Sequence, residues 1–339
     1  MVSTRRLVNT PIAIAILDDY QNVALQMADW SRLEGKAKIT VFNDHVADDD
    51  ALVERLKPFD VLCVMRERTL LPAAVIERLP NLKLIASTAP INAAIDVAAA
   101  TAHGIFVSGT GYTSSSTIEL TWALILALAR KIPAEASAVR HGGWQVSVGE
   151  DLSGRTLGLL GLGRIGSRVA KIGRVFDMEV MAWSQNLTAD RAEAEGARLV
   201  SKDELLRQAD ILTIHLILSR RTRGLVGASE LALMKPSSLL INTSRGAIVD
   251  EAALVAALAA RRIAGAALDV FNAEPLPEGH PFRTLDNVIA TPHIGYVSKR
   301  QYETFYGDTV ENILAWLEGK PIRPTPDVRA APATPQSRQ

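Results

Sequence analysis

The sequence predicts an α/β protein built from two doubly wound parallel sheets. Short apolar runs of strand length alternate with segments of helical spacing along most of the chain, which is typical of parallel strands joined by crossover helices. A glycine-rich turn, Gly161–Gly166, divides this alternation into two series. The length of 339 residues is more than one hydrophobic core usually spans, so we expect two domains.

The first series begins after the polar segment Met1–Thr10, which we expect to be loosely held. The carboxylates Asp48–Asp50 can cap a helix that ends at Leu56, because they satisfy free N–H groups at a helix start. Helical spacing also predicts helices at Leu71–Leu79 and Ile95–Ala102. The expected strands are Ile12–Leu17, Lys38–Phe42, Val61–Met65, Leu82–Ser87 and Ile105–Ser108.

Ahead of the glycine turn, the sequence predicts a helix that starts in the hydroxyl-rich Ser114–Glu119 and continues as a strongly apolar stretch, which we expect to be buried. A last helix, Gln301–Leu317, is expected to cross back onto the first domain. The proline-rich Pro321–Gln339 should form an extended arm, with residues 326–339 as a flexible tail. The other expected helices are Ala134–Arg140, Arg164–Phe176, Asp203–Gln208, Ser229–Met234 and Glu251–Ala260. The expected strands are Leu157–Leu160, Val180–Trp183, Ile211–Leu216, Leu239–Thr243, Ala266–Val270 and Val288–Ala290.

The glycine turn has the spacing G-x-G-x-x-G between a strand and a helix, which favours a dinucleotide-binding turn. Gly161 allows the tight turn, Gly163 lets the backbone approach phosphates, and Gly166 lets the helix pack on the strand. The helix start at Arg164 and Ile165 offers free N–H donors and a partial positive charge. We therefore expect a pyrophosphate here; the alternative is a plain glycine turn in an α/β domain.

Composition argues against several other classes of protein. The formal net charge is zero, so no basic field favours nucleic acid or an anionic membrane. No apolar stretch approaches the roughly 20 residues of a membrane span, and no signal peptide is evident, so we expect a cytoplasmic protein. The single cysteine, Cys63, lies in a predicted buried strand and is expected to serve core packing. No Cys/His spacing suggests zinc, and we expect no metal.

Three residues that could carry chemistry, Arg245, Glu274 and His293, follow apolar runs of the second series. A doubly wound sheet binds ligands outside the carboxyl ends of its strands, so these side chains should project towards the dinucleotide. Histidine suits the proton of an alcohol being oxidised, a carboxylate orients its ring, and arginine can hold a substrate carboxylate. Singly, they could be a surface arginine, a loop acid and a strand-end histidine. Together, after a dinucleotide turn, they favour catalysis.

Arg245, Glu274 and His293 lie in motifs through which the chain resembles the D-isomer-specific 2-hydroxyacid dehydrogenase family. The resemblance extends over nearly all of Ile12–Ile322. The resemblance implies a Rossmann-type cofactor domain, residues 113–298, inserted into a flavodoxin-like substrate domain, residues 1–112 and 299–325. It also implies a homodimer built through the cofactor domain, and an active-site cleft closed by hinge motion. Beyond the glycine turn, the motifs are Asn242–Asp250 (Asn-Thr-Ser-Arg-Gly-Ala-Ile-Val-Asp), Ala267–Leu276 (Ala-Leu-Asp-Val-Phe-Asn-Ala-Glu-Pro-Leu) and Thr291–Gly295 (Thr-Pro-His-Ile-Gly).

The same resemblance implies a role for each of these residues. Arg245 would bind the carboxylate and carbonyl of the substrate, and His293, paired with Glu274, would be the acid/base. Asp269 would bind the carboxamide of the nicotinamide, and Arg245 and His293 would also border the cofactor. Further cofactor contacts are implied at Thr243, Ser244, Gly295, His215 and Leu216.

Two departures from the family pattern affect the expected ligands. Where NAD-preferring members have an acidic residue for the ribose hydroxyls, this chain has Ser184, which is compatible with NAD or NADP. We favour NAD slightly, because no arginine adjoins this serine. In the substrate loop, Ala89 and Ile91 stand where glycines are common, and Pro90 has no N–H to donate. One donor to the substrate carboxylate is therefore missing, and Arg66 is either a second anion contact or a surface arginine.

We therefore expect an NAD(P)-dependent oxidoreductase that interconverts a small 2-oxoacid and its D-2-hydroxyacid. One alternative is a dinucleotide-sensing binding protein, as in the corepressor branch of the family, which can keep the same three residues. Another is a phosphoglycerate dehydrogenase that lacks a C-terminal regulatory domain, because the chain ends too soon to include that domain.

Overall fold

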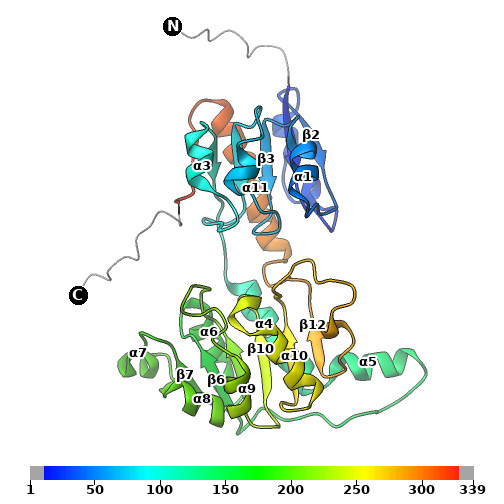
Figure 1. The fold of residues 1–339 in the computed structure, drawn as a ribbon, viewed down its shortest axis with the longest axis vertical. Helices are drawn as coiled ribbons and strands as arrows, with labels where there is room; N and C mark the ends of the chain where they lie inside the picture. The colour runs from blue at the N-terminus through cyan, green and yellow to red at the C-terminus, as the bar shows by residue number, and fades with distance from the viewer. Residues whose placement is uncertain (1–10, 328–339) are drawn as a thin grey trace. The chain divides into compact units, whose positions relative to one another are not determined.

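The computed structural model describes residues 11–327, which form two compact units (Figure 1). The first unit consists of the residues up to Thr113 together with those from Lys299 onwards, and the second is Ser114–Ser298. The helix expected to return to the first domain therefore belongs to the first unit. The segment 1–10 that we expect to be loosely held, and the expected flexible tail from residue 328 onwards, lie outside the described residues.

The first unit is built on a five-stranded parallel sheet with the order β2-β1-β3-β4-β5. This is the flavodoxin-like order of a doubly wound fold, which confirms the expected class. Its central strands β3 and β4 are buried along their whole length, as in other parallel sheets. The strands are β1 (Ile12–Ile16), β2 (Ala37–Val41), β3 (Val61–Val64), β4 (Leu84–Ser87) and β5 (Phe106–Ser108).

Carboxylates begin two helices of this unit. Asp48 caps α1 (Asp49–Leu56) and Asp96 caps α3 (Val97–Ala102), each by accepting a backbone N–H three residues ahead at 2.9 Å. The cap at Asp48 confirms the prediction made from the sequence. Two short 3-10 helices, η1 (Ala24–Gln26) and η2 (Trp30–Leu33), follow β1.

One expected helix is much shorter than predicted. The pattern at Leu71–Leu79 gives only the single turn of α2 (Ala73–Ile76). Leu71 instead forms an isolated parallel bridge with Ile95, and its N–H donates to the carbonyl of Ala94 at 2.9 Å. This tertiary pairing withdraws Leu71 and Ile95 from the helices in which their apolar spacing places them.

The C-terminal helix α11 (Lys299–Leu317) packs beside β4. Its buried Asn312 donates to the carbonyl of Gly109 at 2.8 Å. After the helix, the N–H of Thr325 donates to the carbonyl of Val107 at 2.9 Å. The beginning of the expected extended arm is therefore paired with the edge strand β5.

The second unit is built on a seven-stranded parallel sheet with the order β12-β11-β10-β9-β6-β7-β8. Taken from β8, this is the strand order of the dinucleotide-binding fold with one added strand. Strand β6 leads into the glycine turn, with β9 and β7 on its two sides. The strands are β6 (Thr156–Leu160), β7 (Glu179–Trp183), β8 (Arg198–Leu199), β9 (Ile211–Ile214), β10 (Leu239–Asn242), β11 (Gly265–Leu268) and β12 (Val288–Ala290).

Helices cover both faces of this sheet. Apolar side chains of α8, α9 and α10 form one core cluster with the strands, and those of α4 and α6 form another. The apolar helix α4 is largely buried, as predicted. The short α7 and the two-residue β8 carry no apolar periodicity, and the sequence pattern does not predict them. The helices are α4 (Ser115–Ala129), α5 (Ile132–Arg140), α6 (Arg164–Val175), α7 (Ala189–Ala194), α8 (Lys202–Gln208), α9 (Ala228–Leu233) and α10 (Glu251–Ala259), with 3-10 helices η3 (Gly246–Ile248) and η4 (Pro281–Arg283).

Five strands of this sheet end level with one another. Successive register pairs join their last residues, Leu160, Ile214, Asn242, Leu268 and Ala290. The residues that follow these strands therefore share one carboxyl edge, where a doubly wound sheet binds its ligands.

Within residues 11–327, no helix has both the length and the apolar character needed to cross a membrane.

Candidate functional site

The glycine turn at the end of β6 forms a cradle that side chains would fill. Gly161 has φ 103°, and a Cβ there would lie 2.7 Å from the carbonyl oxygen of His215. A Cβ on Gly166 would overlap the carbonyl oxygen of Gly161. Gly163, at the start of α6, faces open space within 4 Å of its missing Cβ.

These features fit a pyrophosphate. Arg164 and Ile165 begin α6, and the first N–H groups of a helix have no partner inside it. An anion at Gly163 would meet these donors and the positive end of the helix dipole. A side chain at that position would block such an approach, and no packing contact within 4 Å requires the glycine.

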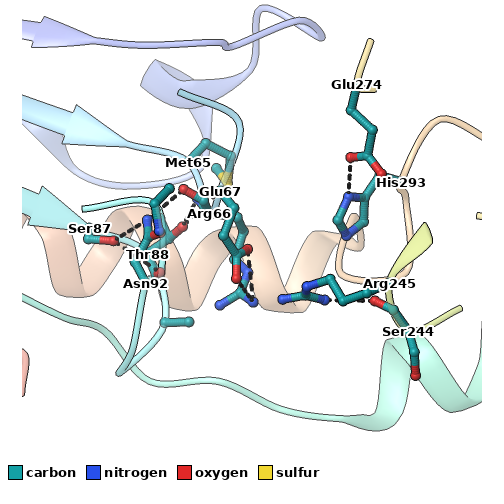
Figure 2. Close-up of polar contacts among 12 residues, drawn as sticks. Met65, Arg66, Glu67, Ser87, Thr88, Asn92, Ser244, Arg245, Glu274 and His293 are labelled. Carbon is teal, nitrogen blue, oxygen red and sulfur yellow. Dashed lines mark hydrogen bonds and ion pairs between the residues drawn. The ribbon is translucent and has the colours of Figure 1, made fainter. Parts of the chain in front are cut away.

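His293 and Glu274 form a close hydrogen-bonded pair at the same edge of the sheet. His293 Nδ1 lies 2.6 Å from one carboxylate oxygen of Glu274, and both side chains are partly exposed (Figure 2). The other oxygen of Glu274 accepts the N–H of Phe271 at 2.9 Å. The carboxylate is thereby fixed on one side and holds the imidazole on the other, which leaves Nε2 as the ring nitrogen available to a ligand.

Asp269, the residue after β11, holds the segment that carries His293. Its buried carboxylate accepts the hydroxyl of Thr291 at 2.6 Å and the N–H groups of Ile294 and Gly295, each at 2.8 Å. His293 itself has φ 52°, a conformation that non-glycine residues rarely adopt. Burial raises the pKa of the Asp269 carboxyl, although these hydrogen bonds oppose the shift.

Arg245 follows β10 in a turn that Asn242 closes. The Asn242 side chain accepts the N–H of Ser244 and donates to the carbonyl of Arg245, both at 3.0 Å. The Arg245 guanidinium donates to the carbonyl of Ser244 at 2.8 Å (Figure 2). Next to it, Gly246 lies against the backbone of Phe271, where a Cβ would overlap main-chain atoms. Asn242 thus positions Arg245, and the N–H of Phe271 positions Glu274. Sequence reasoning missed both, although a polar residue ending an apolar strand is a signal.

The other residues expected to bind the cofactor lie around this edge. The Ser244 hydroxyl donates to the carbonyl of Ile214 at 2.9 Å, and the hydroxyls of Thr243 and Thr121 are 3.0 Å apart. Ser184 follows β7 and is half-buried. Leu216 follows β9, and its side chain would lie 3.1 Å from a Cβ on Gly161.

His215 is neutral in this setting. Its Nε2 lies 3.0 Å from the hydroxyl of Thr213, and its Nδ1 is buried with no partner among the described residues. Burial lowers the pKa of His215 to about 3. A histidine that resists protonation to this extent is not suited to acid/base work near neutral pH.

The substrate residues expected in the first unit lie at the carboxyl ends of β3 and β4. Arg66 has φ 51°; its N–H donates to the Thr88 hydroxyl at 2.7 Å, and its carbonyl accepts Asn92 Nδ2 at 2.6 Å (Figure 2). Ala89 has φ 68°, and its N–H donates to the hydroxyl of Thr110 at 2.7 Å, so this amide is used inside the unit. Ile91 is exposed, and the Arg66 side chain pairs with Glu67 at 3.3 Å.

Across residues 11–327, no group of three or more potential metal ligands is found.

The chain is similar to several known proteins. A family model described as the NAD-binding domain of D-isomer-specific 2-hydroxyacid dehydrogenases matches residues 122–295. The glyoxylate reductase of Aeropyrum pernix is 43% identical over 256 residues, which are 73% of this chain and 76% of that protein. The D-3-phosphoglycerate dehydrogenase of Archaeoglobus fulgidus is 38% identical over 278 residues, 81% of this chain but 52% of that protein, so the chain spans about half of its length. A crystal structure of a phosphoglycerate oxidoreductase from Vibrio cholerae has a TM-score of 0.85 and 39% identity, and the match covers 91% of this chain and 99% of that one.

Two glycine substitutions should separate packing from ligand binding. Gly166→Ala places a Cβ against backbone that cannot step aside, and we expect it to lower the unfolding free energy by about 3 kcal/mol. Gly163→Ala meets no neighbouring atom and should leave stability unchanged, yet it should weaken dinucleotide binding roughly tenfold or more, about 1.4 kcal/mol. Thermal unfolding and calorimetric titration with NADH measure the two effects. Equal destabilisation by both substitutions would contradict this assignment.

His215→Asn should reduce the decrease of the unfolding free energy as the pH falls below neutral. The unfolded chain binds a proton at His215 below a pH of about 6.5, whereas the native protein does not until about 3. As pH falls between these values, His215 therefore lowers the unfolding free energy, by up to about 1.4 kcal/mol per pH unit. Urea unfolding of the wild type, His215→Asn and the exposed-site control His103→Asn tests this. A slope that His215→Asn leaves unchanged would show that His215 titrates normally in the native state.

Proposed function

The chain is an oxidoreductase that belongs to the D-isomer-specific 2-hydroxyacid dehydrogenase family, and we propose that it reduces a small 2-oxoacid to its D-2-hydroxyacid. The observation that carries the proposal is the His293–Glu274 pair, 2.6 Å apart, on the sheet edge that also presents Arg245 and the glycine turn. A nicotinamide dinucleotide on that turn supplies hydride for the carbonyl carbon when it is bound.

His293 is the proposed proton donor. Because Glu274 occupies Nδ1, the proton that reaches the substrate oxygen comes from Nε2. As negative charge develops on that oxygen, the Nε2–H bond breaks and an O–H bond forms, which completes the hydroxyacid. Glu274 stabilises the doubly protonated ring before the transfer and keeps its orientation. In the reverse direction the neutral ring accepts the hydroxyl proton.

Arg245 is proposed to bind the substrate carboxylate and to polarise the reacting carbonyl. A guanidinium presents donors in a planar fork that matches a carboxylate. We assign cofactor binding to the second unit, through Gly161–Gly166, Ser184, Thr243 and Ser244. In the first unit, we assign a further substrate contact to Arg66 and its neighbouring loop. The use of the Ala89 amide by Thr110 supports a larger share of carboxylate binding for Arg245.

The proposed substrates are short 2-oxoacids. The relatives named above are a glyoxylate reductase and a phosphoglycerate dehydrogenase. The substrates in these two names are each a 2-oxoacid or a 2-hydroxyacid. Oxidation of NADH and NADPH should be followed with glyoxylate, hydroxypyruvate, pyruvate and phenylpyruvate. Turnover with at least one of them is expected. Tight dinucleotide binding without turnover of any oxoacid would instead favour a dinucleotide-sensing protein.

We also propose a homodimer formed through the second unit. No residue of α5 is buried, and α5 extends from the body of this unit in Figure 1. An isolated helix of this length is unstable unless an apolar face is packed. The exposed apolar side chains of α5 and the following segment form a surface that a second copy would cover: Ile132, Val139, Trp144, Val146 and Val148.

His293→Ala should lower turnover roughly a hundredfold or more, the scale of general acid–base effects. Dinucleotide affinity should stay close to that of the wild type, because the proton donor is not a phosphate ligand. His280→Ala is the matched control: His280 also pairs with a carboxylate, Glu251, at 3.3 Å in the same unit. Steady-state kinetics with the best oxoacid test both variants. Unchanged turnover in His293→Ala would remove this histidine from the mechanism.

The double substitution Trp144→Glu and Val146→Glu should yield monomers, because it puts charge into the proposed dimer surface. Val175→Glu is the control, since Val175 is equally exposed but lies at the end of α6. Sedimentation velocity of the three proteins gives the answer. A monomeric wild type, or a dimer that survives the double substitution, would refute the assignment.

A further inference from the structure

The loops after β7 and β9 flank the glycine turn from opposite sides. The N–H of Gly161 donates to the carbonyl of Trp183, the last residue of β7, at 2.8 Å. On the other side, the missing Cβ of Gly161 would lie 2.7 Å from the carbonyl oxygen of His215, which follows β9. A dinucleotide seated on this turn therefore has as neighbours the ends of both strands, from which the two loops begin. In this fold the adenosine ribose lies at the end of the second strand, here β7.

The β7 loop offers no negative charge to that ribose. Ser184 is followed by Gln185 and Asn186, and the next acid in the chain is Asp190 in the first turn of α7. A carboxylate at the strand end would accept the ribose hydroxyls and repel a phosphate on the 2′ position. Its replacement by uncharged side chains removes that repulsion, although it supplies no attraction by itself.

The β9 loop supplies positive charge. Thr222 folds this loop into a tight turn: its hydroxyl donates to the carbonyl of Ile217 at 2.7 Å and accepts the N–H of Ser219 at 2.8 Å. The turn presents Arg220 and Arg221 at its tip, where both are exposed.

Neither arginine takes part in an ion pair within residues 11–327. Two lysines of the same unit are paired, by contrast: Lys202 with Glu230 at 2.8 Å and Lys235 with Asp210 at 2.7 Å. The two arginines adjoin in the chain and neither is paired with an acid among the described residues, so a bound dianion would supply the missing countercharge. Arginine is also the side chain whose planar fork best matches a phosphate.

We propose that Arg220 and Arg221 bind the 2′-phosphate of NADP(H), so that this chain prefers the phosphorylated cofactor. The proposal rests on the dinucleotide site of the proposed function, and it reverses the slight preference for NAD expected from the sequence. That expectation considered only the residues adjoining Ser184. The fold adds a second loop beside the same turn, and this loop carries the missing cations.

The test uses the full chain and two probes that contain only the adenosine half of the cofactor, 2′,5′-ADP and 5′-ADP. By calorimetry, the wild type should bind 2′,5′-ADP roughly tenfold more tightly or better. The double variant Arg220→Ala/Arg221→Ala should lose this difference and keep its affinity for 5′-ADP. Ser184→Asp should also lower the affinity for 2′,5′-ADP, by repulsion. Arg207→Ala removes an exposed arginine from α8, which leads into the opposite end of β9, and should change neither affinity.

Three results would overturn the proposal. They are equal or weaker binding of 2′,5′-ADP by the wild type, a preference that survives in the double variant, and a loss of affinity for both probes alike. The last would make the loop a general support of the pocket. Because these readings need no turnover, they separate the two proposals. Discrimination without oxoacid reduction would remove the proposed reaction alone, and reduction without discrimination would remove the phosphate site alone.

Discussion

The buried carboxylate of Asp269 is the constraint on which the site depends. His293 has φ 52°, and a conformation of this kind costs on the order of 1–3 kcal/mol unless its surroundings impose it. Asp269 imposes it by accepting the N–H groups of the next two residues, Ile294 and Gly295. The carbonyl of Gly295 in turn accepts the hydroxyl of Thr117 in α4 at 3.0 Å. The imidazole is therefore presented to Glu274 by backbone that is fixed at several points.

The parallel register extends this local order to the whole edge. Strands that end level place the glycine turn, Arg245, Asp269 and the His293 segment in one row, although they are distant in sequence. The opposite end of the same sheet has a structural use. There Asp210 accepts the N–H of Thr156 at 2.9 Å and pairs with Lys235, and these partners hold the pKa of its carboxyl below the usual value despite burial.

Much of this organisation can be predicted from the sequence, because it depends on patterns with a period. Alternating strands and helices gave the fold class and nearly every strand, and the motifs around Arg245, Glu274 and His293 gave the family. The missed features depend on particular tertiary contacts. Leu71 pairs with Ile95 and shortens α2, and the sequence contains no local sign of that pairing. The hydrogen bonds from Ile294 and Gly295 to Asp269 were missed for a similar reason, since a residue type at a strand end does not reveal which N–H groups it will accept.

The proposed roles of Arg245, Glu274 and His293 imply one reaction with one stereochemical outcome. Hydride would reach a carbonyl held by Arg245 on one face of the dinucleotide, and the proton would come from His293 on a fixed segment. Chiral chromatography of the product formed from hydroxypyruvate and reduced cofactor tests this most directly. The account predicts D-glycerate as the sole enantiomer. A racemic product, L-glycerate, or no product with any short 2-oxoacid would contradict it.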